Sequence, residues 1–181
     1  MGTSRPFYLS DFADFVLVNQ PTTCLDIGIG FGKNGSLIRE YTDIWNGRYT
    51  KDNWKTRIFG IEIFEEYITD SSRYIYDQVF VMDAYEFLKI QKSKMDLIVA
   101  TDVVEHFERE KAIEMMSMIK EKSNNYFITI PKNVGNRPGH SSKGVGFNKY
   151  EAHISGEWTR QELEKFGTVR DYNNWIWNIY S

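Results

Sequence analysis

Residues 24–35, CLDIGIGFGKNG, contain an acid followed by four glycines, and glycines let a ligand lie directly on the backbone. The spacing of the glycines restricts which ligand fits. A dinucleotide-binding turn, G-x-G-x-x-G, would require glycine where Lys33 stands. A phosphate-binding loop would require Lys and then Ser or Thr after Gly35, where Ser36 and Leu37 stand. The turn matches neither pattern, and the pattern that is present is D-x-G-x-G-x-G, formed by Asp26, Gly28, Gly30 and Gly32.

Three further acids stand where later apolar runs end: Glu62, Asp83 and Asp102. A carboxylate can accept two charge-assisted hydrogen bonds at once, for example from the two hydroxyls of a vicinal diol. For Asp83 and Asp102 an alternative is open, because an acid at the end of a strand also caps the helix that follows.

Side chains suited to proton transfer follow the fourth apolar run and recur in a later loop. Glu105 and His106 are adjacent, and His153 lies in the loop that should form the far side of a pocket above the strand ends. Imidazole and carboxyl groups are the usual general bases. For His106 the alternative is a packing or hydrogen-bonding role at the start of a helix.

The elements that would position these residues alternate along the chain. Apolar runs predict strands over 22–27, 56–64, 78–83, 95–102 and 125–130. Helical periodicity predicts helices over 7–18, 33–44, 65–76, 84–91 and 107–122. This alternation is typical of a parallel sheet with helices on both faces. Residues 45–55 and 131–156 look irregular.

The last part of the chain departs from this alternation. Residues 159–167 predict a helix, with Thr159 as its N-cap and Glu162 as the capping-box partner. The runs 168–172 and 174–181 are too close together for a helical crossover, so we expect an antiparallel hairpin around Asn173 and Asn174.

The D-x-G-x-G-x-G turn resembles motif I of the class I S-adenosylmethionine-dependent methyltransferases. Four later landmarks fit that family in order: the acid in FGIEIF, the acid in VMDAYEF, the D-x-x-E-H pattern in DLIVATDVVEHF, and Pro131 after the fifth strand. The segment HISGEWTRQEL, 153–163, is also similar to one that precedes the last helix of many members.

The resemblance implies a Rossmann-like α/β fold: a mostly parallel seven-stranded sheet with helices on both faces and a C-terminal antiparallel hairpin. It implies S-adenosylmethionine as cofactor and S-adenosylhomocysteine as product. Glu62 should accept the ribose hydroxyls, Ile63 should pack on adenine, and Asp83 should meet the adenine amino group. Glu62 stands about thirty residues after the glycines instead of about twenty, which we attribute to an insertion at 45–55. The implied cofactor-binding residues are Asp26, Gly28, Gly30, Gly32, Glu62, Ile63, Asp83, Ala84, Thr101 and Asp102.

The implied reaction is methyl transfer to an oxygen or nitrogen of a small-molecule or sugar-like acceptor, with His153, His106 and Glu105 as candidate general bases. Cysteine-dependent pyrimidine methylation is excluded because the single cysteine, Cys24, lies in the first strand. We expect no metal, since Pro131-Lys132-Asn133 supplies no second acid to accompany Asp102.

Composition sets the remaining expectations. The 181 residues suggest one methyltransferase domain over 1–181, and the net charge of −3 with scattered Lys and Arg argues against a nucleic-acid partner. The sequence lacks an apolar run long enough for a membrane span, so we expect a cytoplasmic enzyme without a membrane partner. A homo-oligomer is compatible with the sparse acceptor site. Two alternatives stay open: a non-catalytic S-adenosylmethionine-binding partner or sensor subunit, and a nicotinamide-dependent oxidoreductase, which Lys33 disfavours.

Overall fold

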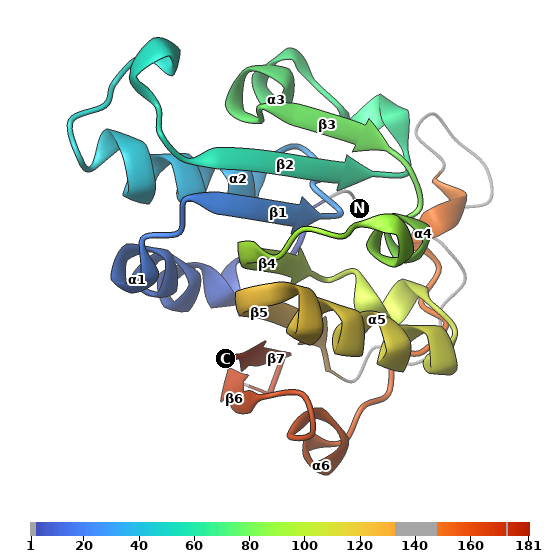
Figure 1. Ribbon diagram of the computed structural model, residues 1–181. Helices are drawn as coiled ribbons and strands as arrows, with labels where there is room; N and C mark the ends of the chain where they lie inside the picture. The colour runs from blue at the N-terminus through green and yellow to red at the C-terminus, as the bar shows by residue number, and fades with distance from the viewer. Residues whose placement is uncertain (1–2, 133–147, 173) are drawn as a thin grey trace.

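A computed structural model describes residues 3–132, 148–172 and 174–181. Its seven strands form one sheet in the order β3-β2-β1-β4-β5-β7-β6 (Figure 1). The strands are β1 Thr23–Ile27, β2 Arg57–Glu62, β3 Gln78–Val81, β4 Met95–Thr101, β5 Ser123–Pro131, β6 Thr168–Tyr172 and β7 Ile176–Tyr180. β1 to β5 are parallel, whereas β7 is antiparallel to both β5 and β6. The expected mostly parallel sheet with its C-terminal hairpin is confirmed.

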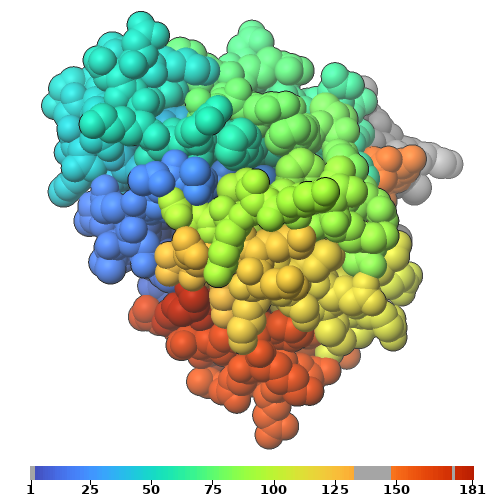
Figure 2. Space-filling view, viewed as in Figure 1, coloured from blue at the N-terminus to red at the C-terminus, as the bar shows by residue number. Residues whose placement is uncertain are grey.

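Helices cover both faces of this sheet. They are α1 Leu9–Asn19, α2 Lys33–Arg39, α3 Asp70–Ile75, α4 Ala84–Ile90, α5 Arg109–Lys122 and α6 Arg160–Leu163. Successive side chains of a buried strand point to opposite faces of the sheet, so the hydrophobic core has two parts. Ile98 of β4 packs on the side of α4 and α5, whereas Leu97 and Val99 pack on the side of α1 and α2. In the space-filling view, side chains of α4 and α5 form a continuous layer over one face (Figure 2).

Several expected helices are shorter or change type. The 33–44 helix continues beyond α2 as a π-helix, Glu40–Ile44. The 65–76 helix is divided into a 3₁₀ turn, Glu65–Tyr67, and α3, because Thr69 adopts an extended conformation and caps α3 with a capping box. The 107–122 helix begins at Arg109, after a 3₁₀ turn at Val104–His106. These breaks follow from local capping, which hydrophobic periodicity does not record.

The C-terminal prediction is confirmed in its main features. Thr159 and Glu162 form the expected capping box, and β6 pairs with β7. The helix ends at Leu163 instead of 167. Asn173, at the expected hairpin bend, and most of the 131–156 loop lie outside the described residues.

The strand order determines where a ligand can bind. β1 lies between β2 and β4, and the helices that follow β1 and β4 lie on opposite faces of the sheet. This is a topological switch point, and in open α/β sheets a crevice opens there beyond the carboxyl ends of the strands. Residues 3–5 and the 3₁₀ turn Lys149–Glu151 also lie at this end (Figure 1). Among the described residues, no helix combines the length and apolar character needed to cross a bilayer.

Candidate functional site

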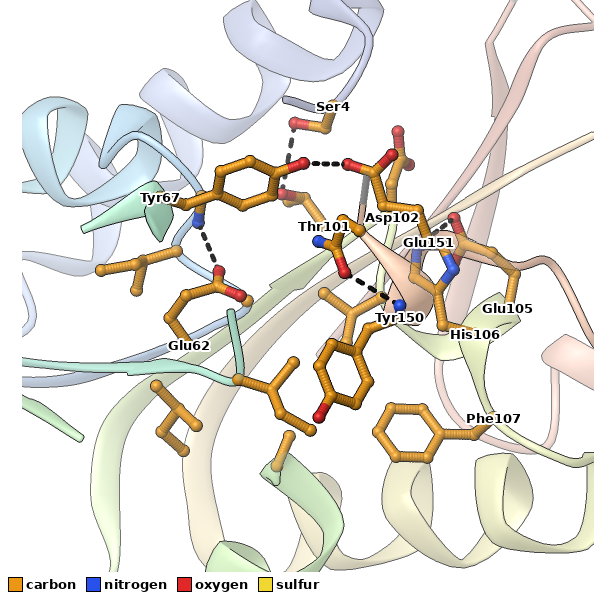
Figure 3. Close-up of a pocket in the computed structure, with 18 of the residues that line it drawn as sticks. Ser4, Glu62, Tyr67, Thr101, Asp102, Glu105, His106, Phe107, Tyr150 and Glu151 are labelled. Carbon is orange, nitrogen blue, oxygen red and sulfur yellow. Dashed lines mark hydrogen bonds and ion pairs between the residues drawn. The ribbon is translucent and has the colours of Figure 1, made fainter. Parts of the chain in front are cut away.

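A cavity of about 500 Å³ lies at the carboxyl ends of β1 to β4. It is lined by the glycine turn after β1, by the residues that end β2, β3 and β4, by Thr3–Arg5, and by residues 148–154. Glu62 lies on one side and the adjacent Glu105 and His106 lie on the other (Figure 3). The switch-point crevice is therefore a chamber large enough for a small-molecule ligand.

The glycine turn has backbone geometry that only glycine adopts readily. Gly28 has φ +69°, and a Cβ on this residue would lie 2.6 Å from Val103 Cγ2, so a larger residue would collide with the loop after β4. Gly30 has φ +51° and also lines the cavity. The Gly28 and Ile29 amides donate to the Ile61 carbonyl, which fastens the turn to the end of β2.

Glu62 joins the glycine turn to the end of β2. One carboxylate oxygen accepts from the Gly30 amide at 2.9 Å and the other from the Phe64 amide at 3.0 Å. The side chain is only 6% exposed, and burial raises the pKa of its carboxyl despite these amide donors. Each carboxylate oxygen has about two acceptor positions, so Glu62 retains capacity for hydroxyl donors from a ligand in the cavity.

The residues that follow β2 and β3 present both apolar and acidic groups. Ile63, Met82, Asp83 and Ala84 line the cavity. Asp83 also caps α4, because its Oδ1 accepts from the Glu86 amide at 3.1 Å. The capping alternative for Asp83 is therefore present in the structure, and the cap fixes this side chain at the rim of the cavity.

Asp26 lies behind the turn and is completely buried. Its carboxylate accepts from the Tyr76 hydroxyl at 2.5 Å and from Asn34 Nδ2 at 3.2 Å, and Asn34 in turn donates to Thr101 at 2.9 Å. Burial raises the pKa of Asp26 to about 6. Of the ten predicted cofactor-binding residues, Asp26 and Gly32 are the two that do not line the cavity. Asp26 supports the turn from behind instead of facing a ligand.

Asp102 follows β4 in a strained conformation with φ +54°. Its carboxylate accepts from the Thr129 hydroxyl at 2.9 Å and from the Arg5 amide at 3.3 Å. Burial raises the pKa of Asp102. These partners come from β5 and from the N-terminal segment, so Asp102 connects three parts of the cavity wall. The side chain of Asp102 does not cap the 3₁₀ turn that follows it.

The three candidate bases meet on the far wall. Glu105 is completely buried, and burial together with the charge of Asp102 raises the pKa of its carboxyl well above the usual range. Burial lowers the pKa of His106, whose ring lies edge-on to that of His153 with centroids 5.1 Å apart. Because its pKa is lowered, the His106 imidazole is neutral at neutral pH, which is the form that accepts a proton. The raised pKa of Glu105 favours its protonated form, which is not a base.

Residues 148–155 form the wall beside these groups. The Ile154 and Ser155 amides both donate to the Glu105 carbonyl, and the Tyr67 hydroxyl donates to Glu151 at 2.5 Å. Sequence reasoning did not identify Tyr67, Glu151, Asn34 or Tyr76. Tyr67 and Tyr76 bond partners 84 and 50 residues away, so no local pattern marks these pairs. Asn34 bonds Asp26 within the glycine turn itself, but the spacing of the glycines does not reveal this contact.

Of the comparisons with known proteins, the one with solved structures finds proteins of the same fold. No family model and no curated protein sequence matches the chain. Among solved structures, TehB from Haemophilus influenzae superimposes with a TM-score of 0.63 at 15% identity, over 94% of this chain and 60% of that one. The chain thus spans less than two-thirds of the length of TehB.

Two further structures carry printed activities. The 1,6-didemethyltoxoflavin-N1-methyltransferase from Burkholderia thailandensis, solved with S-adenosylhomocysteine, has a TM-score of 0.61 at 13% identity over 94% of this chain and 75% of that one. The methyltransferase domain of bacterial CtHen1 has a TM-score of 0.58 at 14% identity over 98% of both chains. The chain has the methyltransferase fold. The sequence identity to these structures is too low to assign their activities to this chain.

Proposed function

We propose that the protein is an S-adenosylmethionine-dependent methyltransferase that acts on an oxygen or nitrogen of a small-molecule or sugar-like acceptor. The observation that carries the proposal is Glu62, which lines the cavity while it holds the glycine turn through the Gly30 amide. The motif residues from the ends of β1, β2 and β3 converge on one cavity, and the fold agrees with that of methyltransferases.

The residues fit the cofactor chemically. A carboxylate is suited to a ribose diol, Ile63 and Met82 offer an apolar surface for adenine, and Asp83 offers an acceptor for its amino group. The cavity bears no P-loop lysine pattern, which suits a nucleoside without phosphates. When bound, S-adenosylmethionine supplies a methyl group already activated by a positively charged sulfur. The protein then needs mainly to align the acceptor, which is worth roughly 7–11 kcal/mol in well-oriented reactions.

The acceptor would face Glu105, His106 and residues 148–154. A neutral hydroxyl or amine acceptor must lose a proton during transfer, and the neutral His106 imidazole is the group there best suited to receive it. The His153 ring contacts the His106 ring and also lines the cavity.

Titration calorimetry with S-adenosylhomocysteine tests the cofactor assignment. We expect binding to the parent protein, and about 10-fold to 100-fold weaker binding to Glu62→Gln. This substitution keeps the side-chain size but removes the charge, and hydrogen bonds to charged groups contribute about 1.5–3 kcal/mol. Glu66→Gln, an exposed neighbour, is the matched control and should bind as the parent does. Equal affinity in Glu62→Gln would remove Glu62 from the site, and binding of NAD instead would favour the oxidoreductase.

Turnover separates an enzyme from a non-catalytic subunit. Protein incubated with cofactor labelled at the methyl group and with varied cell extracts should transfer the label to a small-molecule fraction. If S-adenosylhomocysteine binds but no extract yields a labelled product, the partner or sensor alternative is favoured.

A further inference from the structure

Three potential ligand groups meet on the cavity wall opposite Glu62. Glu105, His106 and His153 each place one oxygen or ring nitrogen so that the three atoms all lie within 4.8 Å of one another. All three residues line the cavity. Two of them are adjacent in the 3₁₀ turn after β4, and the third comes from the segment pinned to that turn by the Ile154 and Ser155 amides.

Glu105 has an environment that a carboxyl group rarely occupies. It is completely buried, and neither carboxylate oxygen has a hydrogen-bond partner among the described residues. Buried polar groups are almost always satisfied, because leaving one unpaired costs roughly 1–3 kcal/mol and more when it is charged. A cation in the adjoining cavity would satisfy this carboxylate.

His106 is oriented as a ligand would be. Its Nδ1 lies 3.1 Å from the Ala152 carbonyl, so Nδ1 carries the proton and donates to that oxygen. The Nε2 lone pair is then left facing Glu105, with Nε2 3.9 Å from Oε1. Histidines that bind metals almost always donate their other ring N–H to a carbonyl or carboxylate in this way.

We propose that Glu105, His106 and His153 bind a divalent transition-metal ion at the cavity wall. Two imidazoles and one carboxylate suit Zn²⁺, Fe²⁺ or Co²⁺ better than Mg²⁺ or Ca²⁺, which prefer oxygen ligands. Metal–ligand distances of about 2.0–2.2 Å place two ligands of one ion at most about 4.4 Å apart, so small side-chain rotations close the site. Three protein ligands leave coordination positions open toward the cavity.

The site would also narrow the acceptor class, an extension that rests on the proposed function. A hydroxyl oxygen bound to the ion would have a lowered pKa, release its proton to water, and attack the methyl carbon, so that His106 would serve as a ligand and not as the general base. The new carbon–oxygen bond forms as the carbon–sulfur bond breaks, and the sulfur retains that electron pair as a neutral thioether. The acceptor would then be an alcohol, phenol or sugar hydroxyl.

This proposal reverses the expectation from sequence that no metal binds. That expectation considered only acids after the fourth and fifth strands. It did not consider two histidines with Glu105, because the separation of His153 from His106 along the chain conceals their contact.

The test uses Co²⁺ and Zn²⁺ with chelator-treated protein and does not depend on activity. We expect about one equivalent of Co²⁺, with the visible absorption bands of Co²⁺ bound to nitrogen and oxygen, and displacement by Zn²⁺ in calorimetry. Glu105→Gln and His153→Ala should each weaken binding at least about 10-fold, whereas the exposed Glu121→Gln should not.

S-adenosylhomocysteine binding serves as the folding control and separates the two proposals. The Glu105→Gln and His153→Ala proteins should still bind this ligand. Unchanged Co²⁺ affinity in both variants, or binding of Mg²⁺ with neither Co²⁺ nor Zn²⁺, would overturn the metal site and leave the methyltransferase proposal standing. Metal binding without any S-adenosylhomocysteine binding would instead refute the proposed function.

Discussion

Asp26 has an unfavourable environment for a charge, because it is completely buried and burial raises its pKa from 3.8 to about 6. Between those pH values the folded protein holds a proton that the unfolded chain has released. The stability contributed by this group therefore falls as pH rises from about 4 to about 6 and stays lower above that range. At 1.36 kcal/mol per pH unit, the effect is roughly 3 kcal/mol.

Asp26→Asn should flatten this pH dependence, because the amide does not ionise. Urea unfolding at several pH values between 4 and 8 measures the free energy of unfolding for both proteins. Part of the slope should persist, since Glu62, Asp102 and Glu105 also have raised pKa values and act with the same sign. Asp52→Asn, which removes an exposed carboxylate, is the matched control for loss of one acid. An identical slope in Asp26→Asn would show that Asp26 is not protonated in this range.

At the scale of elements, the packing of α2 against α3 sets the position of the glycine turn. Gly35 lies in α2, and a Cβ there would come within 2.3 Å of the buried Tyr76 ring. The Tyr76 hydroxyl accepts from the Gly35 amide and donates to Asp26, so this ring joins α2 to the end of β1.

Gly35→Ala should destabilise the protein by about 1–3 kcal/mol, the usual cost of overpacking. Helix propensity alone predicts the opposite sign, a gain of about 1 kcal/mol, so the direction of the change identifies the clash. The displaced turn should also weaken S-adenosylhomocysteine binding. Ser36→Ala is the control at the next, exposed position of the same helix. It removes one hydrogen bond from the Ser36 hydroxyl to the Gly32 carbonyl and creates no clash, so it should cost less than about 1 kcal/mol in urea unfolding. A Gly35→Ala protein more stable than the parent would contradict this description of the packing.

At the scale of the whole molecule, the cavity is lined by residues from the ends of four strands, so binding of the proposed ligand there should stabilise the entire fold. At a free concentration of 100 times Kd, S-adenosylhomocysteine should add about 2.7 kcal/mol. For a chain of this size, thermal scans should show Tm rising by roughly 5–10 °C. Glu62→Gln at the same ligand concentration should show a smaller rise. A parent protein whose Tm does not respond would count against the cofactor assignment.

Much of this architecture was predictable because the central strands β1, β4 and β5 are buried on both faces and appear as short apolar runs. Acids that end such runs, Glu62 and Asp83, reach the cavity because parallel strands end at one edge of the sheet.

What the sequence did not indicate is pairing over long separations. Tyr76 meets Asp26 from another strand–helix unit. His153 meets His106 because backbone hydrogen bonds hold the later segment to the 3₁₀ turn after β4. These contacts depend on tertiary placement, which hydrophobic periodicity cannot express. The burial of Glu105 was hidden for the same reason.

The attachment of residues 148–155 has a consequence for engineering. The Ile154 and Ser155 amides hold this wall to the Glu105 carbonyl through main-chain atoms, which side-chain substitutions leave in place. Tyr150 and Ile154 can therefore be exchanged for smaller or more polar residues while the wall keeps its anchorage. If the proposed methyl transfer is confirmed, this segment is the place to begin a library that changes which acceptors are used.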